Sequence, residues 1–408
     1  MMRRIGLVFL FVWMAMALPG PARAADAAFT RFIASLWPQA EAAGVSRATF
    51  ERETAGLEPD FKLPDLALPG RGVTGSRAQA EFVQVPSDYL KESTIARLAA
   101  EGQRLMAKHG DALAQIERQF GVPAPIVLAI WGRETDYGRY TSSYDALRVV
   151  ATQAYVGRRK EQYQAEFILA LKILDAGLVS RKAFRASWAG ATGLTQFLPS
   201  DYFAHAVDLD GDGRADIWTS VPDALASAAK QLADKGWQSG LRWAYEVRAP
   251  AQMDCTLGVP DVQKPLADWL RGGYAPVVAP SPAELGQPAS LLQPEGIYGP
   301  AFLTTKNYFV LKEYNFSDLY VLFVGHLADR MQDPRRFATP WSASTQLRTK
   351  SVEAMQARLQ SMGLYADKID GKAGMRTRAA VGAYQKAAGL TVDCWPSEAV
   401  LKAMGAGP

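Results

Sequence analysis

The sequence predicts a mainly α-helical protein with a small β subdomain and a separate, small three-helix domain at its C-terminus. Three observations favour this fold class. Apolar residues recur at helical spacing through most of residues 26–235. Residues 243–256 alternate as a strand does, and the proline-rich stretch 275–298 indicates irregular connections around a small sheet. Residues 337–348 have the composition of a linker, and residues 349–408 carry three short helical patterns.

The N-terminus has the order of a signal peptide. Arg3 and Arg4 precede an apolar run, residues 5–18, and small residues follow up to position 24. The prediction is therefore an exported protein with residues 1–24 as leader and residues 25–336 as the main domain. The apolar run is short for a membrane span, and no cysteine stands at the cleavage site to carry a lipid anchor.

The charge balance argues against a nucleic-acid partner. The chain holds 45 basic and 41 acidic residues. Removal of Arg3, Arg4 and Arg23 with the leader leaves 42 basic residues against 41 acidic ones. A mature chain so close to neutrality offers no extended basic surface for phosphates.

Helical segments are expected along the first half of the chain. Phe29, Phe32, Ile33 and Leu36 form the first stripe, and Pro59 begins a Pro/Gly-rich loop that ends near residue 75. Further helical patterns follow at residues 93–120, 144–178 and 222–235, and another pattern closes the main domain at residues 302–331.

Residues 121–138 place one carboxylate in an apolar setting. Pro123 and Pro125 suit the first turn of a helix, where no backbone donor is lost. The side chain of Glu134 then falls on the stripe of Val127, Ile130 and Trp131, which predicts a buried acid. Burial would raise the pKa of this carboxyl and allow it to act as a proton donor. A salt bridge within a packed core is the alternative.

Asp136 is not expected to act together with Glu134. Two residues apart on a helix, their side chains diverge by roughly 200°. Glu134 therefore stands as one acid without a local partner carboxylate.

Two further segments carry polar side chains in a pattern that suggests a ligand site. Arg158 and Arg159 could engage the hydroxyls or carboxylates of a sugar polymer, although a solvated helix start explains them equally well. The small-residue run from Ser187 to Ser200 allows close backbone approach. Packing accounts for its glycines but not for Gln196, whose amide needs partners beside apolar neighbours.

Residues 208–216 follow the start of a calcium loop. Carboxylates at loop positions 1, 3, 5 and 9 and a glycine at position 6 are supplied by Asp208, Asp210, Asp212, Asp216 and Gly213. Position 12 is Thr219, so Asp223 would have to provide the last carboxylate. A structural Ca²⁺ is predicted, with an Asp/Gly turn that binds no metal as the alternative.

The two cysteines, Cys255 and Cys394, are expected to be free thiols. They lie in different predicted domains, outside any dense cysteine framework, and disulfide geometry is demanding. Export would permit a disulfide, which is the alternative.

Four ordered motifs together resemble the lytic murein transglycosylase B family over roughly residues 28–335. They are residues 131–138 (WGRETDYG), the run 187–200 (SWAGATGLTQFLPS), the Asp208 loop with Ile217-Trp218, and residues 314–317 (YNFS). The C-terminal unit resembles a peptidoglycan-binding module, on Leu359-Gln360, Asp370-Gly371, Ala380-Val381 and Tyr384-Gln385.

This resemblance implies a lysozyme-like catalytic domain that cleaves the β-1,4 bond between N-acetylmuramic acid and N-acetylglucosamine and leaves a 1,6-anhydro end. No cofactor is required for that reaction. Glu134 would serve as acid and then base, because the muramoyl 6-hydroxyl replaces water and a second carboxylate becomes unnecessary. The resemblance also implies a periplasmic location in a Gram-negative bacterium and peptidoglycan strands as partner, with other cell-wall enzymes as further candidates.

The family positions that line the cleft correspond to Arg158, Arg159, Ser187, Gln196, Tyr314, Asn315 and Tyr320. Thr192 and Leu194 depart from the family pattern, which usually has Met at the first position, and Cys394 replaces a common glycine. A hydrolytic muramidase and a non-catalytic wall-binding scaffold are the competing hypotheses.

Overall fold

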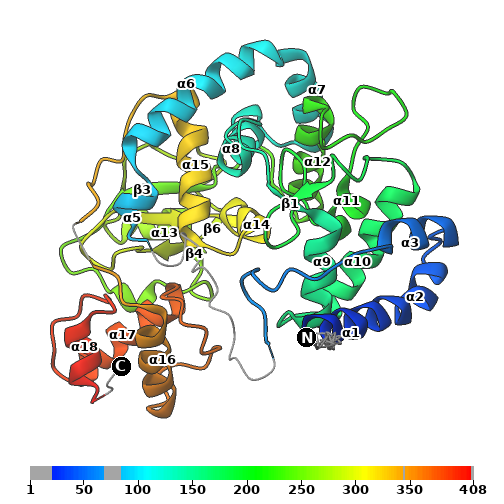
Figure 1. Ribbon diagram of the computed structural model, residues 1–408. Helices are drawn as coiled ribbons and strands as arrows, with labels where there is room; N and C mark the ends of the chain where they lie inside the picture. The colour runs from blue at the N-terminus through cyan, green and yellow to red at the C-terminus, as the bar shows by residue number, and fades with distance from the viewer. Residues whose placement is uncertain (1–20, 69–83, 343–344, 406–408) are drawn as a thin grey trace, which may run out of the picture.

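The computed structural model describes residues 21–68, 84–342 and 345–405 (Figure 1). Residues 1–20 of the predicted leader lie outside this range, and residues 21–24 begin helix α1. The helices of the N-terminal region are α1 (Pro21–Ser35), α2 (Trp37–Ala42), α3 (Arg47–Thr54), α5 (Pro86–Tyr89), α6 (Glu92–Lys108) and α7 (Gly110–Phe120). Among the described residues, no helix combines the length and apolarity that a membrane crossing requires.

Helix α8 (Ala124–Thr135) lies in the middle of the main domain, with α6 and α15 (Asp318–Gln332) packed against it (Figure 1). Its side chains are buried on every face from Pro125 to Gly132, so it is a core helix and not an amphipathic surface helix. Pro125 lies in the first turn, as the sequence predicted, whereas Pro123 is the N-cap residue just before the helix. The elements that follow α8 are β1 (Tyr144–Asp145), α9 (Ala146–Val156), α10 (Lys160–Asp175), β2 (Arg185–Ala186), α11 (Pro199–His205) and α12 (Val221–Asp234).

A five-stranded antiparallel sheet forms the β subdomain on the other side of α15. Its strand order is β4-β6-β7-β3-β5, with Tyr245 opposite Leu303 in the central pair. The expected strand at 243–256 is shorter than predicted, because its second half turns into loops and a 3-10 helix. The bounds are β3 (Ala244–Arg248), η1 (Cys255–Leu257), β4 (Lys264–Pro265), α13 (Leu266–Arg271), β5 (Ala275–Pro276), β6 (Pro288–Leu292), β7 (Ala301–Thr304) and α14 (Lys306–Tyr314).

The C-terminal domain consists of α16 (Thr349–Ser361), α17 (Met375–Ala387) and α18 (Glu398–Ala403), as predicted. One buried amide organises its first loop. The Gln356 side chain accepts hydrogen bonds from the backbone N–H groups of Asp370 and Gly371 and donates to Thr377. A polar side chain with this many partners fixes the loop between the first two helices at little desolvation cost.

Residues 337–341 of the predicted linker lie against the β subdomain. The rings of Phe337 and Trp341 contact Phe302 of β7, and the backbone N–H groups of Ala338 and Thr339 donate to the Glu246 carboxylate. The segment therefore contributes to packing as well as joining the domains.

The prediction of free thiols is wrong, because Cys255 of η1 and Cys394 of the C-terminal domain form a disulfide. The two cysteines were assigned to separate units, but the units are docked and bring the Cα atoms within 6.1 Å. Cys394 has a left-handed backbone with φ of 54°, which explains why glycine is common there. Its N–H donates to the Gln385 side chain, which holds this conformation in place.

Candidate active site

Glu134 lies in the last turn of α8, where the chain leaves the core. Thr135 ends the helix, and both Asp136 and Tyr137 adopt left-handed backbone conformations, with φ of 51° and 58°. The sequence predicted a buried acid. Val127, Ile130 and Trp131 are buried, but Glu134 itself is only half-buried. Because the helix ends one residue later, the carboxylate stands at the margin of the core.

The Tyr320 hydroxyl donates a hydrogen bond of 2.6 Å to Oε1 of Glu134. Tyr320 is buried in α15 and its ring is stacked parallel to Tyr314, with 6.4 Å between the centroids. Burial, followed by the nearby Glu134 charge, raises the pKa of the Tyr320 hydroxyl well above its ordinary value. Tyr320 was predicted to bind substrate, yet its hydroxyl is engaged with Glu134 and holds one carboxylate oxygen in a fixed direction.

Asp136 is directed to a different partner. Its carboxylate forms an ion pair of 2.8 Å with Arg97 of α6. Arg133, the residue before the acid, uses two guanidinium nitrogens to donate to the Tyr89 hydroxyl, at 3.0 and 2.6 Å. Glu134 and Asp136 thus point to different partners, as their spacing predicted, and Glu134 is the one that contacts Tyr320.

The small-residue run is hydrogen-bonded to α8, which carries Glu134, and to the end of α14. The Thr135 hydroxyl donates to the Leu194 carbonyl oxygen at 2.8 Å, and the Tyr314 hydroxyl donates to the Thr195 carbonyl oxygen at 2.7 Å. Gly193 is required at its position, since a Cβ there would lie 2.8 Å from the Ile217 carbonyl oxygen. These hydrogen bonds and the close packing at Gly193 hold the run beside Glu134, and the periodicity of the sequence does not reveal such contacts.

Gln196 occupies a strained position in this run. Its φ is 59°, a conformation that non-glycine residues seldom adopt. The side-chain amide donates to the Gly193 carbonyl oxygen at 2.9 Å, and its oxygen accepts from Ser142 at 3.4 Å. These are the partners that the sequence analysis required for this amide, and such strain is typical of a binding site.

Glu166 is a functional candidate that the sequence analysis missed. This buried carboxylate of α10 accepts hydrogen bonds from the backbone N–H and the hydroxyl of Ser200, at 3.0 and 2.7 Å. Burial raises the pKa of Glu166, although the Ser200 hydrogen bonds oppose that shift. It shares a helical stripe with Tyr163 and Ala170, so the rule that singled out Glu134 would have found it too. Its role is to hold the end of the small-residue run.

The remaining predicted substrate residues are engaged in hydrogen bonds or ion pairs within the protein. Arg158 is exposed and pairs with Asp65 at 3.3 Å, whereas Arg159 donates to the Tyr163 hydroxyl at 3.2 Å. The Ser187 hydroxyl accepts from the backbone N–H groups of residues 189 and 191 and shapes the turn. Asn315 follows α14, and its side-chain oxygen accepts from the Ser317 N–H.

The two departures from the family pattern have structural explanations. Thr192 is fully buried, where its hydroxyl donates to the Arg185 carbonyl oxygen at 2.7 Å and accepts from the Trp218 indole at 2.9 Å. A methionine could not donate the first hydrogen bond, and its sulfur would accept the second only weakly. Leu194 packs over Gly138, close enough to leave only 3.3 Å for an added Cβ.

The predicted calcium loop gathers three of its five carboxylates. Ligand oxygens of Asp208, Asp210 and Asp212 lie within 4.8 Å of one another and are exposed. Asp216 accepts from the backbone of Trp218 and Thr219. Asp223 is fully buried and accepts from the N–H groups of Leu209 and Asp216, so these last two predicted ligands brace the loop ends.

The helical domain, with Glu134 at a helix end beside a strained polar loop, has the arrangement expected of the lysozyme-like class that the sequence motifs implied. Family models sharpen this class: a transglycosylase SLT domain matches residues 28–329, and a putative peptidoglycan-binding domain matches residues 348–404. The chain therefore belongs to the lytic transglycosylase family with this domain.

Individual relatives agree with this assignment. Membrane-bound lytic murein transglycosylase B of Escherichia coli is 30% identical over 222 residues, which are 54% of this chain and 60% of that protein. The structure of SltB3 from Pseudomonas aeruginosa in complex with NAG-NAM-pentapeptide is 36% identical, with a TM-score of 0.83 over 92% of this chain and 99% of that one. E. coli Slt35 in complex with calcium is 26% identical, with a TM-score of 0.53 over 63% of this chain and 81% of that one.

Proposed function

We propose that this protein cleaves peptidoglycan between N-acetylmuramic acid and N-acetylglucosamine without water and leaves a 1,6-anhydromuramoyl end. The observation that carries the proposal is the Glu134 carboxylate, held by Tyr320 beside the small-residue run, while the neighbouring Asp136 is directed to Arg97. Glycosidases that use water employ two carboxylates at a defined separation. A relative, SltB3, has also been solved in complex with NAG-anhNAM-pentapeptide, a ligand with an anhydro end.

In the proposed mechanism Glu134 first transfers its proton to the glycosidic oxygen. The C1–O bond of the muramoyl residue breaks, and the N-acetylglucosamine leaves as an alcohol. The 6-hydroxyl of the same muramoyl residue then bonds to C1 while the Glu134 carboxylate takes its proton. Glu134 ends the cycle protonated again, so one residue serves both steps.

The hydrogen bond from Tyr320 fits this cycle. It fixes the direction of the carboxylate through Oε1, so the group is oriented before it exchanges its proton. Arg158, Arg159, Ser187, Gln196, Tyr314 and Asn315 are proposed to bind the strand around it.

The test is the identity of the ends released from purified sacculi. Wild-type protein should release muropeptides with anhydro ends, which mass spectrometry distinguishes from hydrolysed ends by the absence of one water. Glu134→Gln keeps the shape of the side chain and should lower turnover by about 10²- to 10⁴-fold, as expected for loss of a general acid. Reducing ends would indicate a muramidase, and sacculus binding with no release by the wild type would indicate a scaffold.

We further propose that Asp208, Asp210 and Asp212 bind a structural Ca²⁺. Hard carboxylate oxygens suit this ion, and the three oxygens are close enough to share one cation. The calcium complex of Slt35 supports the proposal. The ion would stabilise the loop ahead of α12 and take no part in the chemistry.

Calcium should raise the thermal midpoint of the folded protein, and a chelator should lower it again. Asp212→Asn should remove this response. Asp223→Asn should lower the midpoint with and without calcium, because Asp223 holds two backbone N–H groups. An equal response of wild type and Asp212→Asn would contradict the site.

Export to the periplasm also remains a proposal. It is supported by the signal-like N-terminus and by relatives that are murein enzymes. Peptidoglycan is the proposed partner, and association with other cell-wall enzymes stays a prediction.

A further inference from the structure

Arg133, the residue before Glu134 on α8, carries a positive charge into the protein without an ion pair. Its guanidinium carbon lies 4.8 Å from the centroid of the Tyr89 ring and 5.1 Å from that of Phe323, and both rings are buried. Its two hydrogen bonds go to the neutral Tyr89 hydroxyl. Among the residues that the structure describes, none offers it a carboxylate as ion-pair partner. A cation withdrawn from water normally has such a partner, so this arrangement is unusual.

Helix α15 brings Arg133 and Glu134 to one place. Adjacent residues of a helix point about 100° apart, so α8 alone does not make the two side chains meet. Tyr320 and Phe323 are three residues apart on α15 and therefore lie on one face of that helix, about one turn from each other. Tyr320 binds the Glu134 carboxylate, and Phe323 packs on the Arg133 guanidinium. The guanidinium thus lies about one helical turn from the carboxylate.

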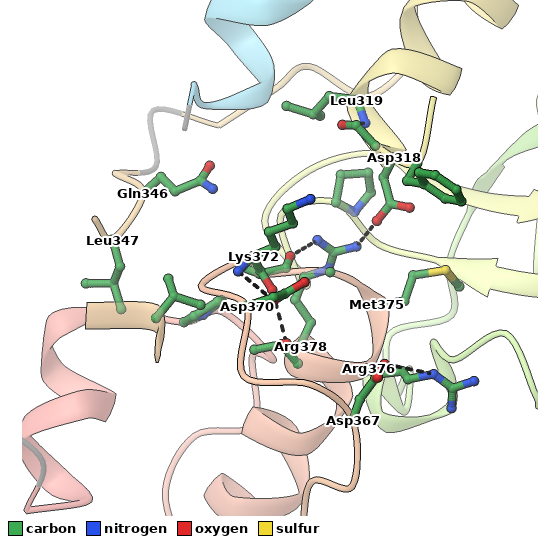
Figure 2. Close-up of a pocket in the computed structure, with 18 of the residues that line it drawn as sticks. Asp318, Leu319, Gln346, Leu347, Asp367, Asp370, Lys372, Met375, Arg376 and Arg378 are labelled. Atoms are coloured by element: carbon green, nitrogen blue, oxygen red, sulfur yellow. Dashed lines mark hydrogen bonds and ion pairs between the residues drawn. The ribbon is translucent and has the colours of Figure 1, made fainter. Parts of the chain in front are cut away.

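Helix α15 is itself held at its first residue by the C-terminal domain. Asp318 pairs with Arg378 of α17 at 2.9 Å, and both side chains are buried. Figure 2 shows this ion pair as a dashed line at the pocket between the two domains. The pair and the Cys255–Cys394 disulfide fix the two domains to each other, so the face of α15 that carries Tyr320 has a constant position.

The electrostatic interaction between Arg133 and Glu134 is mutual. Burial disfavours the charge of Arg133, but Tyr89 and then the nearby Glu134 and Tyr320 favour it more strongly and raise the pKa of the guanidinium above its ordinary value. A cation at this distance in turn favours the ionised form of a carboxyl group. The charge of Arg133 is available for this effect because no carboxylate of its own neutralises it.

The charged groups of the other helices packed against α8 are directed elsewhere. On α6 and the turn after α8 they form three ion pairs, Arg97–Asp136, Arg104–Glu101 and Arg139–Glu101. Helices α7 and α12 contribute apolar side chains to the core around α8. The field that these helices exert at the acid is therefore largely cancelled within each pair.

The groups on the opposite side of Glu134 are neutral or already bonded. Burial, followed by the Glu134 charge, raises the pKa values of the Tyr314 and Tyr320 hydroxyls well above their ordinary range, so neither carries a charge. Asp201 of α11 accepts a hydrogen bond from the Leu198 N–H. A change at Arg133 therefore alters the charge nearest the acid along α8 and leaves these groups as they are.

We propose that Arg133 is a positioning residue that acts through Glu134: its charge favours release of the proton by the acid and stabilises the resulting carboxylate until the muramoyl 6-hydroxyl returns a proton. In this role Arg133 forms no bond with the substrate. The inference rests on the proposed function for the assignment of Glu134 as acid and then base. It adds the group that sets the proton affinity of that residue.

The test is the pH dependence of kcat/KM for release from purified sacculi in Arg133→Met, Arg133→Gln and Arg133→Lys. The basic limb of this profile reports loss of the proton from Glu134 in the free enzyme. The two neutral variants should move the limb up by about one pH unit, because loss of the cation raises the proton affinity of Glu134 about ten-fold. They should also lower the maximal rate by up to about ten-fold, since the acid is weaker. Arg133→Lys keeps the charge and should keep the limb at its wild-type pH.

Arg104→Met provides the matched control. It removes the same charge from α6, but the Arg104 side chain is 60% exposed, and Glu101 keeps Arg139 as a partner. Water and salt screen an exposed charge, so the limb should move by less than about 0.2 pH units. Unchanged thermal midpoints would show that the variants are folded, and Arg133→Gln carries the test if Arg133→Met does not fold.

Three results would overturn the inference: a lower rate with an unmoved limb in the neutral variants, an equal shift in Arg133→Lys, or an equal shift in Arg104→Met. The first would make Arg133 a packing residue, the second would assign the effect to side-chain shape, and the third would assign it to net charge. Failure of the proposed function is visible separately, because it appears in the ends released by wild type or as full activity of Glu134→Gln.

Discussion

Replacement of Arg378 by methionine should strongly destabilise the docked protein. The Arg378 and Asp318 side chains are only 10% and 9% exposed, so the substitution leaves a buried carboxylate with one cation fewer. Removal of one partner of a buried pair costs about 3–5 kcal/mol. Asp318 retains Lys312 and Tyr308, which places the expected loss in the free energy of unfolding at about 3 kcal/mol.

Arg376 provides the matched control. It crosses the same interface two residues earlier and pairs with Asp261, but these side chains are 44% and 65% exposed. An exposed pair contributes about 0–1 kcal/mol, so Arg376→Met should have little effect. Salt at 0.5 M should reduce the small Arg376 contribution and leave the Arg378 contribution nearly unchanged, because buried charges are poorly screened.

The assay is urea unfolding at pH 7 followed by tryptophan fluorescence, with the double variant Arg378→Met/Asp318→Asn completing a mutant cycle. The cycle should give a coupling energy of about 2–3 kcal/mol. If Arg378→Met cost no more than Arg376→Met, the interface would not depend on the buried pair. That result would refute the reasoning that the pair fixes the two domains.

Two further predictions concern side chains of α15. Tyr320→Phe removes a charge-assisted hydrogen bond of about 1.5–3 kcal/mol, so it should lower kcat on sacculi roughly 10- to 100-fold and change the pH–rate profile. Tyr314→Phe should act mainly on KM, because its hydroxyl binds the small-residue run. Equal effects of the two substitutions would contradict the assigned roles. Burial, together with Arg330, lowers the pKa of His326 to about 3, so the unfolded chain binds a proton that the folded one excludes between about pH 6.5 and pH 3. Stability should therefore fall by roughly 2–3 kcal/mol from pH 6.5 to 4.5, and His326→Phe should remove this part of the slope; unfolding measured across that range in both proteins checks it.

The local features of the site could be predicted from the sequence because they depend on neighbouring residues. The two prolines that begin α8, the position of Glu134 on its stripe and the three helices of the C-terminal domain follow from spacing and capping rules. The small-residue run was recognised as unusual through Gln196. Its partners could not be named, because Gly193 and Ser142 reach it only in the folded chain.

The features that escaped prediction depend on contacts between distant segments. Cys255 and Cys394 are 139 residues apart, and their pairing requires that two domains dock, which no local pattern encodes. Asp223 carries a carboxylate of the kind that binds metal ions. Its burial and the two backbone N–H groups that donate to it depend on where α12 packs in the folded chain. The sequence indicates which side chains could bind a ligand or a metal ion, and the fold decides which of them already have hydrogen-bond partners within the protein.

The difference between what the sequence indicates and what the fold provides also applies to Glu134. From the sequence, Glu134 lacks a partner carboxylate, which alone would fit either a core ion pair or a catalyst. The structure supplies a hydrogen bond from the neutral hydroxyl of Tyr320, 186 residues further on. A neutral donor orients the carboxylate without binding it permanently as an ion pair would, so the residue remains able to release and recover a proton. That choice of partner favours the catalytic interpretation over the structural one.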